Sequence, residues 1–166
     1  MEFRKIFDTI PEQFDQYRPR YSTELFSELI EYAHIGPNKS VLEIGPGTGQ
    51  ATSPILQTGC DYHAIELGEH LTQMMKQKFD MIYSAAAIQW IPEETAFSKT
   101  LKLLNPGGIL AMMFTEGDYK APNEALYNRI QKVYDEHFKP DIKYEQGGFQ
   151  YENAIKYGYV EWKRRE

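Results

Sequence analysis

The chain has 166 residues, of which 42% are hydrophobic and 14% aromatic, and its formal net charge is −6 at pH 7. These values predict one domain with a single core over residues 1–166, and the acidic balance argues against a nucleic-acid-binding face. No apolar run reaches the ~18 residues of a membrane span. Cys60 is the single cysteine, which excludes an internal disulfide and favours a reducing, cytoplasmic location.

The first 35 residues are expected to form an N-terminal segment followed by a helix, ahead of a core over residues 36–166. Ser22 can cap a helix that runs to about His34, because apolar residues then recur at helical spacing. Gly36 and Pro37 end this helix. Val41, Leu42 and Ile44 make residues 40–44 mostly apolar and partly β-branched, which predicts the first strand.

Residues 41–50 read Val-Leu-Glu-Ile-Gly-Pro-Gly-Thr-Gly-Gln, a buried strand that breaks into a glycine turn. Gly45, Gly47 and Gly49 allow positive φ angles or the close approach of a ligand to the backbone. A dinucleotide fingerprint has the spacing Gly-x-Gly-x-x-Gly and needs glycine at position 50, where this chain has Gln50. The turn therefore predicts a nucleotide-type cofactor without a pyrophosphate.

The later elements alternate between helices and strands. A helix with Pro54 in its first turn ends at Gly59, and an amphipathic helix spans 123–138. The other predicted helices cover the region around Leu71 and residues 92–104, and the predicted strands are 62–66, 79–84, 109–114 and 154–162. This alternation predicts an α/β fold, doubly wound, with a mostly parallel sheet and helices on both faces.

A second motif limits the class of cofactor that the site could bind. Glu66 ends the predicted second strand, 21 residues after Gly45. A carboxylate at this place accepts hydrogen bonds from ribose hydroxyls in folds of this kind. The glycine turn and Glu66 together predict an adenosine-containing cofactor.

These features resemble the class I S-adenosylmethionine-dependent methyltransferases that modify small molecules. The resemblance rests on residues 41–49, on the aromatic opening from Phe14 to Tyr21, and on the turn Leu104-Asn105-Pro106-Gly107-Gly108. It implies a Rossmann-like fold, S-adenosylmethionine as the cofactor, and a small-molecule substrate, with neither a nucleic acid nor a membrane as a partner. A homodimer is possible, because exposed sheet edges make association easy.

The resemblance also implies roles for individual residues. Gly45, Gly47 and Gly49 would let the backbone approach the amino-acid part of the cofactor, and Glu43 would orient its ammonium group. Glu66 would bind the ribose, and the segment after the 79–84 strand would add Ala85 and Gln89 to the cofactor site. The expected substrate or lid residues are Tyr17, Arg18, Tyr21 and Trp90, with Arg18 able to pair a carboxylate. No catalytic base can be named, and the four histidines lack the spacing of a metal site.

The chain departs from the family pattern between the second predicted strand and the strand that begins at Phe79. Only 12 residues, 67–78, separate Glu66 from Phe79, whereas a helix, a third strand and their loops need at least ~20 residues. The third-strand region is therefore missing from the sequence. Either the chain is a deletion form of the family, or this sequence lacks a segment of the natural chain.

Three functions compete. The first is methyl transfer to a small molecule through an oxygen, carbon or sulfur acceptor. Amino-methylating relatives often carry Asn/Asp-Pro-Pro-Tyr where this chain has Ser84-Ala85-Ala86-Ala87. The second is a catalytically inactive, methyltransferase-like protein that binds the cofactor or serves as a scaffold. The third is a nicotinamide oxidoreductase, which Gln50 disfavours.

Overall fold

The computed structural model describes residues 15–16, 20–66, 77–115, 124–137 and 149–165. The short helix expected around Leu71 and the lid residues Tyr17 and Arg18 lie outside these ranges. The chain divides into two compact units, one of residues 1–113 and 150–166 and the other of residues 114–149. Each unit is described by itself.

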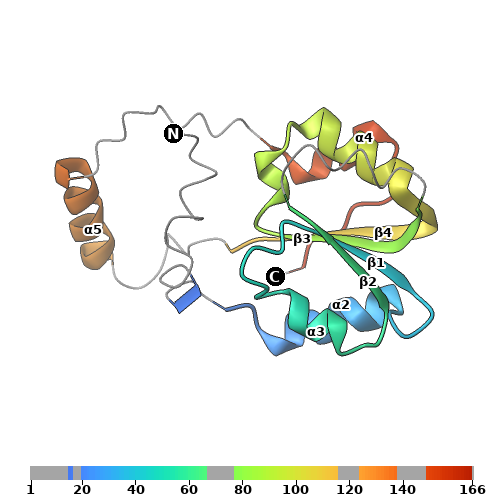
Figure 1. Ribbon diagram of the computed structural model, residues 1–166. Helices are drawn as coiled ribbons and strands as arrows, with labels where there is room; N and C mark the ends of the chain where they lie inside the picture. The colour runs from blue at the N-terminus through green and yellow to red at the C-terminus, as the bar shows by residue number, and fades with distance from the viewer. Residues whose placement is uncertain (1–14, 17–19, 67–76, 116–123, 138–148, 166) are drawn as a thin grey trace. The chain divides into compact units, whose positions relative to one another are not determined.

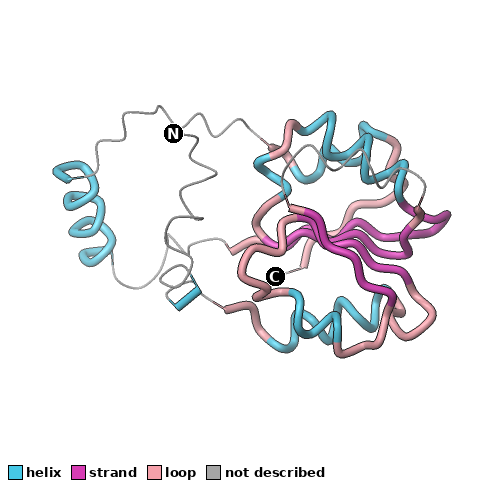
Figure 2. The backbone as a smooth tube through the Cα atoms, in the orientation of Figure 1, coloured by secondary structure: helices cyan, strands magenta, loops and turns pink. Residues whose placement is uncertain are grey.

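The larger unit is built on a parallel sheet of four described strands. These are β1 (Ser40–Ile44), β2 (Asp61–Ile65), β3 (Phe79–Ala85) and β4 (Leu104–Met113), in the order β2-β1-β3-β4. Each neighbouring pair is parallel, and the strands fan across the unit in Figure 2. The expected α/β fold with a parallel sheet is thereby confirmed.

Helices cover both faces of this sheet, as the doubly wound prediction requires. α2 (Thr23–Ala33) and the short α3 (Thr52–Leu56) lie on one face, and α4 (Glu93–Leu103) lies on the other (Figure 1). Side chains of β1 alternate between the two cores: Val41 packs in the cluster on the α2 side, and Leu42 in the cluster that contains Leu103 of α4. This alternation fixes which β1 side chains can meet residues of α3.

The predicted boundaries of the first helix are correct. The Ser22 hydroxyl accepts a hydrogen bond from the Leu25 amide at 3.2 Å, which caps α2. His34 ends the helix in the left-handed region with φ 51°, and Phe26 and Ala33 are buried. This helix packs against β4 and α3.

The predicted last strand, 154–162, is wrong. Residues Tyr151–Tyr157 form the 3-10 helix η5, and Gly158 then turns the chain with φ 104°. The cause is docking onto α4: the Glu93 carboxylate accepts hydrogen bonds from the Gln150 amide, the Asn153 amide group and the Tyr157 hydroxyl at 3.1, 2.9 and 3.3 Å. A segment anchored in this way adds no strand to the sheet.

The segment before the last described strand also differs in detail from the prediction. Leu104, which was expected at the inner face of the helix, begins β4. Residues 105–108 form an irregularity in the pairing, because Phe79 lies opposite Leu104 and Met81 already lies opposite Ile109. The Asn-Pro-Gly-Gly turn is therefore a bulge inside β4.

The smaller unit contains α5 (Glu124–His137), the amphipathic helix expected over 123–138. None of its residues is buried. Its apolar side chains are exposed, and they are Leu126, Tyr127, Ile130, Val133 and Tyr134.

Candidate functional site

The strand order places a topological switch point between β1 and β3. From β1 the chain moves outward to β2 on one side, and β3 and β4 then extend the sheet on the other side. Ligands of such open parallel sheets bind at the carboxyl ends of the strands beside this point. The glycine turn follows β1, Glu66 follows β2, and Ala85 ends β3 just before Ala86 and Ala87, so these predicted residues gather at one edge.

The glycine turn takes conformations that need glycine. Gly45, Gly47 and Gly49 have φ angles of 72°, 54° and 80°. The turn is held by bonds from the Gly45 amide to the Ile65 carbonyl at 2.8 Å and from the Gly49 amide to the Pro46 carbonyl at 2.9 Å. A Cβ atom added at Gly47 would meet no atom of the described residues within 4 Å. The backbone of Gly47 is thus open to a ligand.

Glu66 contacts this turn directly. It is exposed just beyond β2, and its Oε1 atom accepts a hydrogen bond from the Gly47 amide at 2.8 Å. The two motifs that the sequence separates by 19 residues therefore form one polar edge. A ligand at Gly47 would lie beside the Glu66 carboxylate.

Glu43 lies fully buried on β1, on the face that carries α3. Its Oε2 atom accepts hydrogen bonds from the Thr52, Tyr62 and Tyr83 hydroxyls at 2.7, 2.5 and 2.6 Å. Burial, followed by the bond to Glu43, raises the pKa of Tyr62 to about 12, and the same causes raise the pKa of Tyr83 well above its ordinary value. The Oε1 atom of Glu43 is buried and accepts no hydrogen bond from the described residues.

The three hydroxyl partners of Glu43 were missed by the motif analysis. Tyr83 lies directly opposite Glu43 in the β1–β3 register, a pairing that the structure reveals. Register of this kind cannot be read from a single strand. Thr52 comes from the start of α3 and Tyr62 from β2, so the cluster joins three elements around one carboxyl group.

The segment after β3 has small side chains and an unusual backbone. Ala86 takes a positive φ of 54°, which is uncommon for a residue with a Cβ atom, and its amide bonds the Met113 carbonyl at 2.7 Å. Ala85 is half-buried before it, and the 3-10 helix η4 (Ile88–Trp90) follows. Gln89 and Trp90 are both half-buried, and the Oε1 atom of Gln89 is buried without a partner among the described residues.

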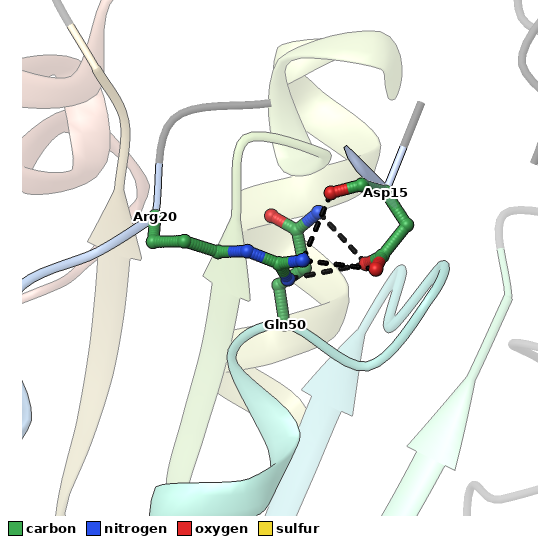
Figure 3. Close-up of polar contacts among 3 residues, drawn as sticks. All are labelled: Asp15, Arg20 and Gln50. Carbon is green, nitrogen blue, oxygen red and sulfur yellow. Dashed lines mark hydrogen bonds and ion pairs between the residues drawn. The ribbon is translucent and has the colours of Figure 1, made fainter. Parts of the chain in front are cut away.

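The N-terminal side reaches the same edge through a residue that was not predicted. Asp15 contacts both Arg20 and Gln50, the last residue of the 41–50 motif (Figure 3). Tyr21, which was expected in the lid, is half-buried and packs edge-to-face on Phe26 at 6.2 Å. Its hydroxyl is buried without a partner in the described part of the chain.

Other kinds of site find no support in the described ranges. No group of three His, Cys, Asp or Glu residues there could hold a metal ion. None of the helices described is long and apolar enough to cross a membrane.

A family profile described as "Methyltransferase domain" matches residues 14–143. Three curated relatives are similar to parts of the chain. Ribosomal RNA small subunit methyltransferase A of Thermosynechococcus vestitus is 37% identical, over 36% of this chain and 22% of the relative. The probable S-adenosylmethionine-dependent methyltransferase CRG1 of Saccharomyces cerevisiae and trans-aconitate 2-methyltransferase of Deinococcus radiodurans are each 28% identical over 61% of this chain, and over 44% and 47% of their own lengths.

The chain thus spans less than half the length of these relatives. The CRG1 alignment has 128 positions, yet 61% of the chain is only about 101 residues. The alignment therefore includes positions where this chain has no residue, which agrees with the internal shortfall expected from the sequence.

A solved structure shares the fold. A putative type II methyltransferase from Anaeromyxobacter dehalogenans superposes with a TM-score of 0.55 at 19% identity, over 81% of this chain and 65% of that chain.

Proposed function

This chain belongs to the methyltransferase-domain family, and from that membership we propose that it binds S-adenosylmethionine and transfers the methyl group to a small molecule. The observation that carries the proposal is the polar edge at the switch point, where the open glycine turn follows β1 and Glu66 follows the neighbouring β2, while Glu43 is buried within β1. S-adenosylmethionine is the cofactor of the family. The runner-up is a protein that binds this cofactor without catalysis.

The residues at this edge fit the cofactor. The open space at Gly47 allows a ligand to approach the protein backbone closely. A residue with a Cβ atom would be strained there, because φ is 54°. The Oε1 atom of Glu43 is a buried acceptor with no donor among the described residues, and an ammonium group of a ligand would supply one. Glu66, already on the turn, would accept from the ribose hydroxyls.

The sulfonium of the cofactor supplies an activated methyl group, so the protein needs to bind, align and exclude water rather than form a covalent bond. We assign Gly45, Gly47, Gly49 and Glu43 to the amino-acid end. Glu66 takes the ribose, and Ala85 and Gln89 line the cofactor from the β3 side. Tyr17, Arg18, Tyr21 and Trp90 are proposed for the substrate side and lid. No residue is assigned as a catalytic base.

The acceptor is proposed from the residues that follow β3. Ser84 donates to the Ile44 carbonyl at 2.9 Å and is fully buried, so it does not face a substrate. The next three residues are alanines, which offer no polar group to an amine. This supports an oxygen, carbon or sulfur acceptor. The relatives include an enzyme named for trans-aconitate and one named for ribosomal RNA, and the net charge of −6 favours the small molecule. The cytoplasmic location stays a prediction.

The test is a calorimetric titration with S-adenosylhomocysteine. We expect one-to-one binding, and we expect Glu66→Ala to weaken it by about 10- to 100-fold, because a hydrogen bond to a charged group contributes about 1.5–3 kcal/mol. Glu124→Ala on the exposed face of α5 is the matched control. A folded protein that does not bind, or binds equally well without Glu66, would overturn the proposal.

A further inference from the structure

A carboxylate outside the glycine motif reaches the turn from the N-terminal segment. The Oδ1 atom of Asp15 accepts a hydrogen bond from Nε2 of Gln50 at 3.1 Å, across 35 residues of sequence. The pKa of Asp15 is lowered to about 2, first by Arg20 and then by the Gln50 and Thr48 side chains. Gln50 directly follows Gly49, so this contact ties Asp15 to the residue beside the third glycine of the turn.

Arg20 closes this contact into a clasp of three residues, Asp15, Arg20 and Gln50. Its guanidinium donates to Oδ1, Oδ2 and the backbone carbonyl of Asp15 at 3.1, 2.9 and 2.9 Å (Figure 3). The two side chains are 56% and 41% exposed, so water screens their attraction and the pair adds little to stability. The two hydrogen bonds to the carboxylate oxygens, together with the third to the backbone carbonyl, fix the orientation of the Asp15 side chain.

The turn is the kind of backbone that needs such a restraint. Glycine has the largest conformational freedom of any residue, and three glycines occur within five positions here. Within the turn, the backbone bonds from the Gly49 amide to Pro46 and from the Thr52 amide to the Gly49 carbonyl hold one side. The Gln50 side chain, at the position where a dinucleotide fingerprint has glycine, holds the other side through Asp15.

We propose that Asp15 is a positioning residue for the glycine turn, oriented by Arg20 and acting through Gln50, so that the N-terminal segment sets the geometry of the cofactor site. The effect on the cofactor rests on the proposed function, whereas the effect on the turn does not. The entropy cost of ordering the turn on cofactor binding would then be smaller, because the clasp already restrains the turn in the ligand-free protein.

The first experiment measures hydrogen–deuterium exchange of peptides that cover residues 45–52 in the ligand-free protein. We expect Asp15→Ala to speed exchange of these amides by about 3- to 10-fold, as a local opening becomes easier, and to leave the β3 peptide unchanged. Asp135→Ala, an exposed carboxylate on α5, is the matched control. Unchanged exchange over 45–52, or equal acceleration in β3, overturns the proposal.

The second experiment is a double-mutant cycle on the dissociation constant of S-adenosylhomocysteine. Asp15→Ala and Gln50→Ala should each weaken binding by about 3- to 10-fold, and the double variant should be no weaker than the worse single variant, since both act through one contact. Fully additive losses overturn the route through Gln50. If the unaltered protein does not bind, the proposed function fails, and the exchange measurement alone decides on Asp15.

Discussion

Glu43 places a carboxyl group inside the sheet with hydroxyl groups as partners. It is fully buried, and no ion pair joins it to a cation among the described residues. A buried carboxyl group is tolerated only when hydrogen bonds replace the water it has lost. Here three hydroxyls converge on one oxygen, and the other oxygen has no hydrogen-bond partner among the described residues.

Tyr83→Phe tests how strongly this cluster supports the fold. The change removes the Tyr83 donor at 2.6 Å and leaves the packing of a fully buried ring. We expect the free energy of unfolding to fall by about 1–3 kcal/mol, measured by chemical denaturation. An unchanged free energy of unfolding in Tyr83→Phe would contradict a stabilising role of the hydroxyl cluster around Glu43.

Tyr62 makes the alkaline stability of the protein pH-dependent. The folded pKa is raised from 10.0 to about 12, so its stabilising contribution is fully present below pH 10. It is lost as the pH rises from 10 to 12, because the unfolded state releases the proton first. Melting temperatures across this range should fall less steeply in Tyr62→Phe than in the unaltered protein. Parallel curves would show that Tyr62 does not titrate late.

Sequence motifs identify Glu43, Glu66 and the glycines because their chemistry is local: strand, turn and acid lie within 24 residues. They do not identify Tyr83 or Asp15. Tyr83 meets Glu43 across 40 residues through strand register, and Asp15 meets Gln50 across 35 residues through the path of a loop. Neither separation leaves a periodic signal.

At the scale of elements, close backbone packing determines the conformation of the Asn-Pro-Gly-Gly bulge at residues 105–108 of β4. A Cβ atom at Gly108 would lie 2.9 Å from the Asn105 carbonyl oxygen and 3.1 Å from that of Phe79, both of which are backbone atoms. The bulge in β4 therefore has no space for a side chain. This steric requirement explains the glycine without any appeal to a ligand.

Gly108→Ala should consequently destabilise the protein by about 1–3 kcal/mol, as other overpacked positions do. Gly36→Ala is the control, since a Cβ atom there meets nothing within 4 Å and the backbone φ is not positive. That change should be neutral or stabilise by about 0.4–1 kcal/mol through the unfolded state. Denaturant midpoints of the two variants measure both effects; a neutral Gly108→Ala would contradict the steric account.

The elements themselves follow from the sequence to different degrees. β1 and α2 match the prediction because apolar periodicity, the Ser22 cap and the glycine turn all agree. The segment after residue 150 misled the prediction: its alternating aromatic residues read as a strand, but Glu93 and Thr100 of α4 hold it by its polar groups. A tertiary contact there overrides the local pattern.

At the scale of the whole molecule, net charge bears on the acceptor. With a charge of −6, the chain should bind RNA weakly, because affinity for nucleic acids comes mainly from cationic contacts to phosphate. Labelled S-adenosylmethionine incubated with the protein and a cell extract should give labelled products in the low-molecular-mass fraction. Label found in RNA instead would move the assignment to the relatives named for ribosomal RNA.

The smaller unit, residues 114–149, is an insertion between two parts of the larger unit, which resumes at Gln150. The Gln150 amide donates a hydrogen bond to the Glu93 carboxylate. At the other end, the Met113 carbonyl accepts a hydrogen bond from the Ala86 amide, so both flanking residues are held by contacts within the larger unit. Evolution can lengthen, shorten or exchange such a stretch without breaking a strand pairing or moving the glycine turn.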